Sequence, residues 1–214
     1  MTETFDQMQQ RALSDPESFW AEAAKAIDWF KPADQVLAPE GYFPRRWFVG
    51  AETNTCYNAL DRHVANGRGD QAAVIYDSPI TGAKATYTYA EMLDQTARFA
   101  GVLAGLGVGK GDRVVIYMPM IPETAVAMLA CARLGAIHSV VFGGFAANEL
   151  AVRIDDSAAK VIVAASCGIE PGRIIPYKPL LDGAIDLASH KPDHCVVFQR
   201  EQATADMQPG RDVD

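Results

Sequence analysis

Apolar runs of strand length alternate with helix-like segments from residue 113 to residue 198, and this alternation constrains the fold more than any other feature. The apolar runs are Arg113–Met118, Ile137–Phe142, Lys160–Ala164 and His194–Phe198. Segments of helical periodicity lie between them, at residues 123–134, 147–157 and 180–188. Strands that are apolar on both faces and are joined by helices are typical of a parallel sheet with both sides covered. The pattern therefore predicts an α/β fold with a parallel sheet flanked by helices.

A hairpin and a further helix are expected just before this sheet. Residues 72–76 and 85–89 are short runs rich in β-formers, and the turn-forming residues 77–82 join them. Thr88 and Glu91 have the spacing of a capping box, after which apolar residues recur on one helical face. We therefore expect a short β-hairpin followed by a helix that leads into the sheet.

The sequence of the first part of the chain predicts a mostly helical extension. Residues 14–17 offer a capping-box pattern before apolar residues at helical spacing, and residues 58–63 form a second helical pattern that stops at Asn66 and Gly67. Between them, Pro32, Pro39, Gly41 and Pro44 punctuate an irregular segment. We divide the chain into an extension over residues 1–66, an α/β unit over residues 67–200 and a polar tail without pattern over residues 201–214.

Charge and cysteine usage limit the compartment and the partners. The net charge is −8 at pH 7 without clustered Lys and Arg, which disfavours a nucleic acid or an anionic membrane. The cysteines Cys56, Cys131, Cys167 and Cys195 form no Cys-x-x-Cys pair, as expected of reduced thiols. The N-terminus has no export signal, and Arg133 and His138 interrupt the most apolar stretch, so we expect a cytoplasmic protein without a membrane span.

Two glycine-bearing loops follow predicted strands, at the edge of a parallel sheet where ligands gather. Gly143 and Gly144 come directly after the second strand, where backbone without side chains can approach a flat or anionic group. The alternative interpretation is that the two glycines only form a tight turn between strand and helix. After the third strand, Pro171-Gly172-Arg173 forms a rigid turn whose guanidinium suits phosphate, although a loop arginine is more often merely solvated. Lys178 could add a second positive charge, with a surface position as the more common alternative.

Two other patterns carry less weight. The residues His190, Asp193, His194 and Cys195 are of metal-binding types, but they bridge a helix end and a strand start and need not converge, so we assign no metal ligand. Residues 107–111 superficially suggest a phosphate loop, but no Ser or Thr follows Lys110, which favours a turn between helix and strand.

Residues 142–150, 153–156 and 170–173 together resemble the short-chain acyl-CoA synthetases of the adenylate-forming superfamily, in the propionyl-CoA synthetase branch. The resemblance covers nearly the whole chain. It identifies residues 1–66 with the N-terminal extension of acetyl-CoA synthetases and residues 67–200 with the first part of the AMP-binding domain. It also implies that residues 201–214 end at a point of truncation.

The resemblance further implies a set of coenzyme A contacts. The nucleotide end of coenzyme A would rest on Phe142, Gly143 and Gly144, and its 3′-phosphate and diphosphate would lie near Glu170, Pro171, Gly172 and Arg173. Ile175 would pack beside the adenine. The acetate branch usually carries an arginine in place of Glu170 and a serine in place of Ala146, and both departures favour the propionate branch. Glu170 is then interpreted as an orienting group.

The reaction implied by this family joins ATP, used with Mg, and a short carboxylate into an acyl-adenylate, from which the thiol of coenzyme A displaces AMP. The ATP-binding loop, the acid for the ribose hydroxyls and the mobile lysine that this chemistry needs are not recognisable in the sequence. We therefore assign no catalytic residue and expect the N-terminal portion of a propionate–CoA ligase, inactive alone, whose partners are small-molecule substrates. The alternatives are an acetate–CoA ligase and a non-catalytic nucleotide-binding or interaction module.

Overall fold

The computed structural model describes residues 3–38 and 46–214, and the chain divides into two compact units at residues 62 and 63. The first unit contains helices α1 (Phe5–Ser14) and α2 (Pro16–Ala23), a 3₁₀ turn (Ala24–Ala26), the antiparallel strands β1 (Gln35–Leu37) and β2 (Trp47–Val49), and a π-type helical turn (Tyr57–Asp61). Of the irregular segment expected after α2, Pro39, Gly41 and Pro44 lie outside the described residues.

Helix α1 was not predicted, and it buries no residue. Its signal lies in its cap: the Thr4 side chain accepts from the Gln7 backbone, while the Gln7 side chain accepts from the Thr4 backbone at 2.9 Å. The helix start expected at Ser14 is also shifted. Asp15 caps α2 instead, accepting from the Ser18 N–H at 3.1 Å.

The second unit opens with a π-type turn (Val64–Arg68) and the antiparallel hairpin of β3 (Ala72–Ser78) and β4 (Ala83–Thr88). The elements that follow are α3 (Tyr89–Gly105), β5 (Arg113–Met118), α4 (Pro122–Leu134), β6 (Ile137–Phe142), α5 (Ala147–Ser157), β7 (Val161–Ala165), β8 (Cys167–Glu170), β9 (Arg173–Pro176), α6 (Tyr177–Leu187), β10 (His194–Phe198) and β11 (Asp212–Val213). The predicted alternation of strands and helices is confirmed. The antiparallel pair of β8 and β9 was not predicted, since each strand has only four residues.

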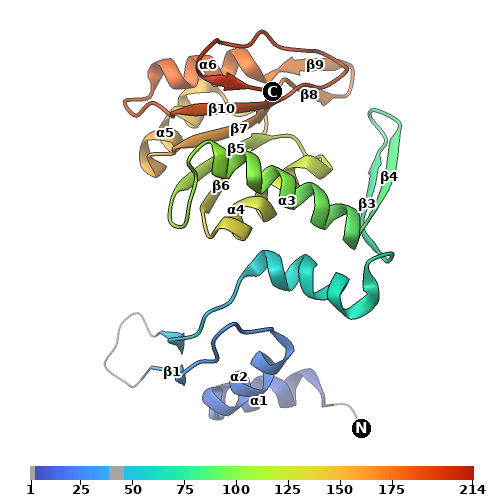
Figure 1. The fold of residues 1–214 in the computed structure, drawn as a ribbon, viewed down its shortest axis with the longest axis vertical. Coiled ribbons are helices and arrows are strands. Elements are labelled where there is room, and N and C mark those ends of the chain that lie inside the picture. The colour runs from blue at the N-terminus through green and yellow to red at the C-terminus, as the bar shows by residue number, and fades with distance from the viewer. Residues whose placement is uncertain (1–2, 39–45) are drawn as a thin grey trace. The chain divides into compact units, whose positions relative to one another are not determined.

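The central sheet has five parallel strands in the order β11-β10-β7-β5-β6. Alternate residues of a strand face opposite sides, so Val115 and Tyr117 pack with α5 and α6, whereas Val114 and Ile116 pack with α3 and α4. Figure 1 shows these two helix pairs on opposite sides of the sheet. The predicted fold class, a parallel sheet flanked by helices, is therefore observed.

Residues 201–214 are not the patternless tail that the sequence suggested. Strand β11 pairs in parallel with β10, and the Asp212 side chain is fully buried against Lys178 at 2.9 Å and Arg211 at 2.7 Å. Lys178 is correspondingly not a surface lysine, since its side chain is 5% exposed and also binds Asp182 at 2.7 Å. This buried charge cluster holds the edge strand by polar contacts, which hydrophobic periodicity cannot reveal.

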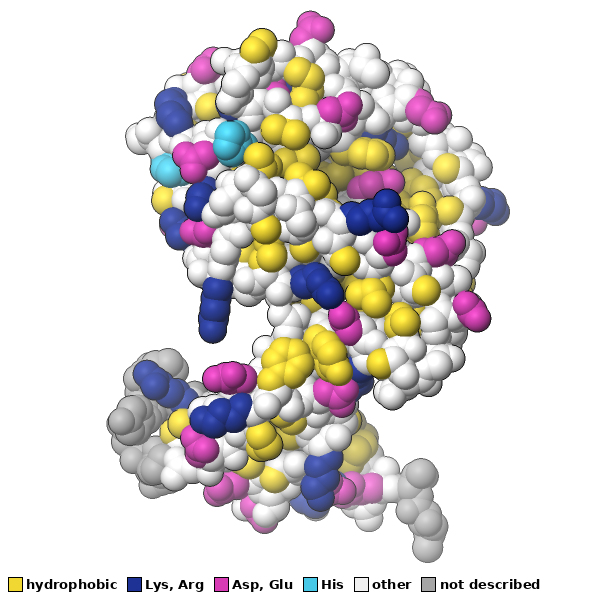
Figure 2. Space-filling view, viewed as in Figure 1, with side chains coloured by type: hydrophobic (Ala, Val, Ile, Leu, Met, Phe, Trp, Pro, Cys, Tyr) yellow, Lys and Arg dark blue, Asp and Glu magenta, His cyan; other side chains and the backbone are white. Residues whose placement is uncertain are grey.

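The face that carries α3 is not fully closed by helices. Figure 2 shows hydrophobic side chains between the charged ones in the region of α3 and β10. A hollow of about 230 Å³ lies here, lined by Phe99, Val102, Val126, Val163, Val196 and Phe198 among others. All four cysteines are buried, and none of them forms a disulfide bond within the described residues. Within the described residues, no helix combines the length and the apolar character that a membrane crossing requires.

Candidate functional site

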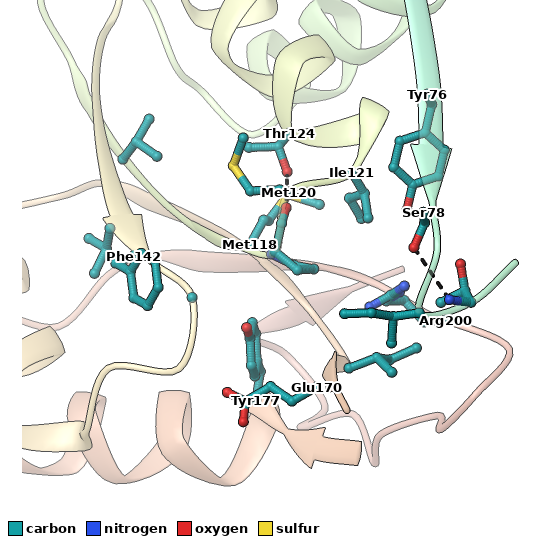
Figure 3. A pocket seen from close by; sticks show the side chains of 17 residues that line it. Tyr76, Ser78, Met118, Met120, Ile121, Thr124, Phe142, Glu170, Tyr177 and Arg200 are labelled. Carbon is teal, nitrogen blue, oxygen red and sulfur yellow. Dashed lines mark hydrogen bonds between the residues drawn. The ribbon is translucent and has the colours of Figure 1, made fainter. Parts of the chain in front are cut away.

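A cavity of about 550 Å³ lies where the parallel strands end, and we call it the inner cavity (Figure 3). Its wall combines residues 118–121 at the end of β5, residues 140–143 at the end of β6, Ile169 and Glu170 of β8, and Arg200 after β10. The hairpin of β3 and β4 adds the side chains of Tyr76, Ser78, Ile80 and Thr81. Carboxyl ends of parallel strands are the usual place for ligands in open α/β sheets.

The chain topology explains why the cavity opens at this point. Strand β5 continues into α4 on one face of the sheet, whereas its neighbour β7 is followed by α6 on the other face. The two connections diverge, which leaves a crevice between them at the edge of the sheet. Neighbouring loops that separate in this way leave room for a ligand without any distortion of the strands.

The hairpin of β8 and β9 forms one border of this crevice. Its register pairs Glu170 with Arg173 across a turn at Pro171-Gly172, and Gly172 has φ of 77°, which favours glycine. The Glu170 carboxylate accepts from Arg173 Nε at 2.8 Å; the Arg173 side chain is largely exposed and that of Glu170 is about half exposed. A second hollow of about 530 Å³, the outer cavity, is lined by residues 169–174 together with Pro79 and Ile80. Glu170 lines both cavities and orients Arg173 toward the outer one.

Two of the glycines make room for an aromatic side chain of the protein itself. A Cβ atom at Gly143 would lie 2.5 Å from the Tyr177 hydroxyl and 3.0 Å from the Met118 carbonyl oxygen. A Cβ atom at Gly168 would also collide with the Tyr177 ring. The flat group that approaches Gly143 is therefore Tyr177, which places this ring as a wall of the inner cavity. Gly144, with φ of 96° and no atom near the position of a Cβ, is open.

The Tyr177 ring is fixed by a second tyrosine. Its centroid lies 4.9 Å from that of Tyr117, whose hydroxyl donates to the Phe145 carbonyl oxygen at 3.0 Å. Burial raises the pKa of Tyr117 to about 12. Burial, with a smaller contribution from the charge of Glu170, also raises the pKa of Tyr177, and the charge of Arg200 acts in the opposite direction. Both hydroxyls consequently stay protonated at neutral pH, as hydrogen-bond donors.

Arg200 brings a cation to the inner cavity. The residue is 9% exposed, and its Nη1 donates to the Cys167 carbonyl oxygen at 3.1 Å. Its backbone N–H donates to Ser166 Oγ at 2.9 Å, and this hydroxyl donates in turn to the Ala203 carbonyl oxygen at 2.7 Å. These contacts fix the start of the side chain, and Figure 3 shows Arg200 among the residues that surround the cavity.

The structure separates the expected coenzyme A residues into four groups. Phe142 and Gly143 line the inner cavity, Pro171, Gly172 and Arg173 line the outer cavity, and Glu170 lines both. Gly144 and Ile175 line neither, and Ile175 packs against the core on the side of α5 and α6. The sequence interpretation missed Tyr177 and Arg200. Arg200 follows a predicted strand by two residues, so the rule that selected the glycine loops applied to it as well.

The residues of metal-binding types near β10 can be placed in the structure. Within residues 3–38 and 46–214, no three His, Cys, Asp or Glu side chains are grouped so as to hold an ion. His190 Nε2 lies 2.8 Å from the Ala159 carbonyl oxygen. Cys195 is buried in the core, where burial raises its pKa to about 12. His190 and Cys195 thus have separate structural environments.

Comparison with known proteins gives two family matches, to "AMP-binding enzyme" over residues 61–210 and to "Acetyl-coenzyme A synthetase N-terminus" over residues 5–59. An uncharacterized protein of Pseudomonas aeruginosa is 54% identical over 99% of the chain and 34% of its own length. Human mitochondrial acyl-CoA synthetase short-chain family member 3 is 52% identical over 95% of the chain and 30% of its own length. Propionate–CoA ligase of Salmonella typhimurium is 45% identical over 99% of the chain and 33% of its own length.

A solved structure shares the fold. Acetoacetyl-CoA synthetase from Streptomyces lividans superposes with a TM-score of 0.83 over 98% of this chain and 34% of that one, at 24% identity. The chain thus spans about a third of the length of each of these proteins.

Proposed function

Because this chain belongs to the AMP-binding enzyme family and carries an acetyl-coenzyme A synthetase N-terminus, we propose that it is the N-terminal portion of an AMP-forming propionate–CoA ligase. The reaction is ATP + propionate + coenzyme A to propionyl-CoA + AMP + diphosphate, with Mg accompanying ATP. The observation that carries the proposal is the 45% identity to a propionate–CoA ligase along 99% of the chain. The cytoplasmic location expected from the sequence is part of this proposal.

The part played by this chain is to form one wall of the coenzyme A site. Phe142 and Gly144 are exposed at the end of β6 and offer a ring and bare backbone for the nucleotide. Arg173, held by Glu170 at the turn, offers a guanidinium to a phosphate of coenzyme A. Glu170 acts on coenzyme A through Arg173, because a carboxylate repels phosphate but can aim a guanidinium. The chain itself performs no bond-making step.

The acid preference is tested with the complete product of the gene. Propionate-dependent exchange of labelled diphosphate into ATP measures adenylate formation without coenzyme A, and acetate serves as the competing acid. We expect a higher kcat/KM with propionate than with acetate. A higher kcat/KM with acetate would show that acetate is the preferred acid, and it would leave the family assignment intact.

The role of the fragment is tested separately. We expect the purified 214-residue chain to make no acyl-CoA from ATP, propionate and coenzyme A, because the groups that bind ATP and assist adenylation are not recognisable in it. Saturable thioester formation by this chain would contradict the assignment of the chemistry to other residues.

A further inference from the structure

Two buried polar side chains of the inner cavity have hydrogen-bonding capacity that the described residues do not use. Arg200 makes one side-chain hydrogen bond, to the Cys167 carbonyl oxygen, and within the described part of the chain it forms no ion pair. The Tyr177 hydroxyl has no hydrogen-bond partner there, although the residue is only 4% exposed. Both residues line the inner cavity. In Figure 3 the Tyr177 hydroxyl end points toward the space between Phe142 and Met118.

The unused donor groups are open to the cavity. Among the described residues, the fully enclosed side-chain N and O atoms without a partner are Thr96 Oγ1 and His194 Nδ1, and neither lies at the cavity. The remaining N–H groups of Arg200 and the Tyr177 hydroxyl are therefore not fully enclosed, and the inner cavity that both residues line is where they can meet a ligand. A buried guanidinium without a carboxylate is costly unless a ligand or water satisfies it.

The charge of the cavity selects the kind of ligand. Glu170 is the acidic residue of its lining, and its Oε2 atom already accepts from Arg173. Arg200 offers only donors and the Tyr177 hydroxyl can donate, so a ligand with anionic acceptor oxygens complements the two groups. A volume of about 550 Å³ greatly exceeds a three-carbon acid and is within the range of nucleotide-sized ligands. The planar fork of arginine fits phosphate oxygens.

We propose that Arg200 and the Tyr177 hydroxyl bind phosphate oxygens of the ligand in the inner cavity. The proposal rests on the proposed function, in which the ligand is coenzyme A. It adds a phosphate contact at the inner end of the site, distinct from Arg173 at the exposed turn. Apolar side chains of Met118, Ile121 and Ile169 line the cavity beside these polar groups.

The experiment measures binding to the complete gene product by titration calorimetry. The ligands are coenzyme A, 3′-dephospho-coenzyme A and pantetheine, which carries no phosphate. Arg200→Gln keeps a donor for the Cys167 carbonyl and removes the charge. Arg98→Gln is the matched control, because Arg98 is exposed and pairs with Asp94 on α3. Tyr177→Phe removes one hydroxyl and keeps the ring against Gly143 and Gly168.

We expect Arg200→Gln to weaken binding of coenzyme A about 10- to 100-fold and Tyr177→Phe about 3- to 10-fold. Pantetheine binding and the control variant should remain unchanged. A loss that persists with 3′-dephospho-coenzyme A assigns Arg200 to the diphosphate, and a loss that disappears assigns it to the 3′-phosphate. Either result supports the proposal.

Equal affinity of wild type and Arg200→Gln for coenzyme A overturns this inference and leaves the proposed function standing. Equal loss for coenzyme A and pantetheine also overturns it, since that result marks a purely structural arginine. Failure of the wild-type protein to bind coenzyme A rejects both proposals. If Arg200→Gln does not fold, Tyr177→Phe provides the test. A loss of affinity for coenzyme A but not for pantetheine supports the proposal, and equal affinities or equal losses overturn it.

Discussion

The hairpin of β8 and β9 and the charge cluster of α6 and β11 both use ion pairs, but in opposite environments. At the hairpin, Glu170 and Arg173 have 46% and 69% exposed side chains. In the cluster, Asp212 is fully buried and Lys178 is 5% exposed. Water can replace the first pair at little cost, whereas the second must remain intact for the edge strand to pack. The exposed pair is thus available to a ligand, and the buried pairs are committed to the fold.

The largest effect is expected from Asp212→Ala, which tests the structural half of this contrast. The change leaves Lys178 buried with Asp182 as its remaining partner, so we expect a loss of about 3 kcal/mol in the free energy of unfolding. Urea denaturation of the chain measures this loss. Asp186→Ala is the control and should change stability little, because Asp186 is exposed near the end of α6, the helix that also carries Lys178. A small loss at Asp212 would show that the cluster is dispensable.

Acid pH gives a second test of the same cluster. Burial alone would raise the pKa of Asp212, but hydrogen bonds from Arg211, the Gln208 backbone and Lys178 outweigh it and lower the pKa overall. A lowered pKa in the folded state contributes stability above the unfolded value, near 4, and this contribution is lost as the pH falls through the folded value. The stability of wild type should therefore fall below about pH 4 more steeply than that of Asp212→Asn. Parallel curves for the two proteins would assign acid sensitivity elsewhere.

A smaller loss of stability is expected at the start of α6, between the inner cavity and the charge cluster. Tyr177 and Lys178 are consecutive, and one faces the inner cavity while the other enters the cluster. In Gly168→Ala the new Cβ collides with the Tyr177 ring, and we expect a loss of about 2 kcal/mol in the free energy of unfolding, as for overpacking in a core. A protein that carries Tyr177→Ala no longer has the ring with which this Cβ collides. Adding Gly168→Ala to that protein should therefore reduce the free energy of unfolding much less than adding it to wild type. An equal cost in both backgrounds would contradict this account.

The sequence revealed the elements that depend on apolar patterning and missed those that depend on polar partners. Strands Ile137–Phe142 and His194–Phe198 are observed at their predicted bounds, because alternating helices and buried strands leave a strong signal. Helix α1 and strand β11 were missed, since one is held by a cap and the other by buried charges from distant positions. No local pattern records that Lys178 will meet Asp212.

The candidate site was only partly accessible for the same reason. The turn at Pro171-Gly172 was recognisable, because Pro and Gly specify a local conformation. The sequence did not reveal that Gly143 also makes room for the ring of Tyr177, thirty-four residues later in the chain, and its contact with coenzyme A stays a prediction. The position of Arg200 at the cavity is visible only in the structure, where the ends of four strands line one cavity. Contacts between distant residues therefore mark the boundary of what this sequence could predict.

Arg173→Ala should have the smallest effect on stability and a selective effect on function, which tests the exposed half of the contrast. We expect the free energy of unfolding to change by less than about 1 kcal/mol, because the pair with Glu170 is open to water. In the complete gene product, the KM for coenzyme A should rise about tenfold, the loss expected for one charge-assisted hydrogen bond. Propionate-dependent adenylate formation should remain unchanged, since coenzyme A takes no part in it. Equal losses in both half-reactions, or a destabilisation as large as that of Asp212→Ala, would reject the distinction between an exposed binding pair and a buried structural one.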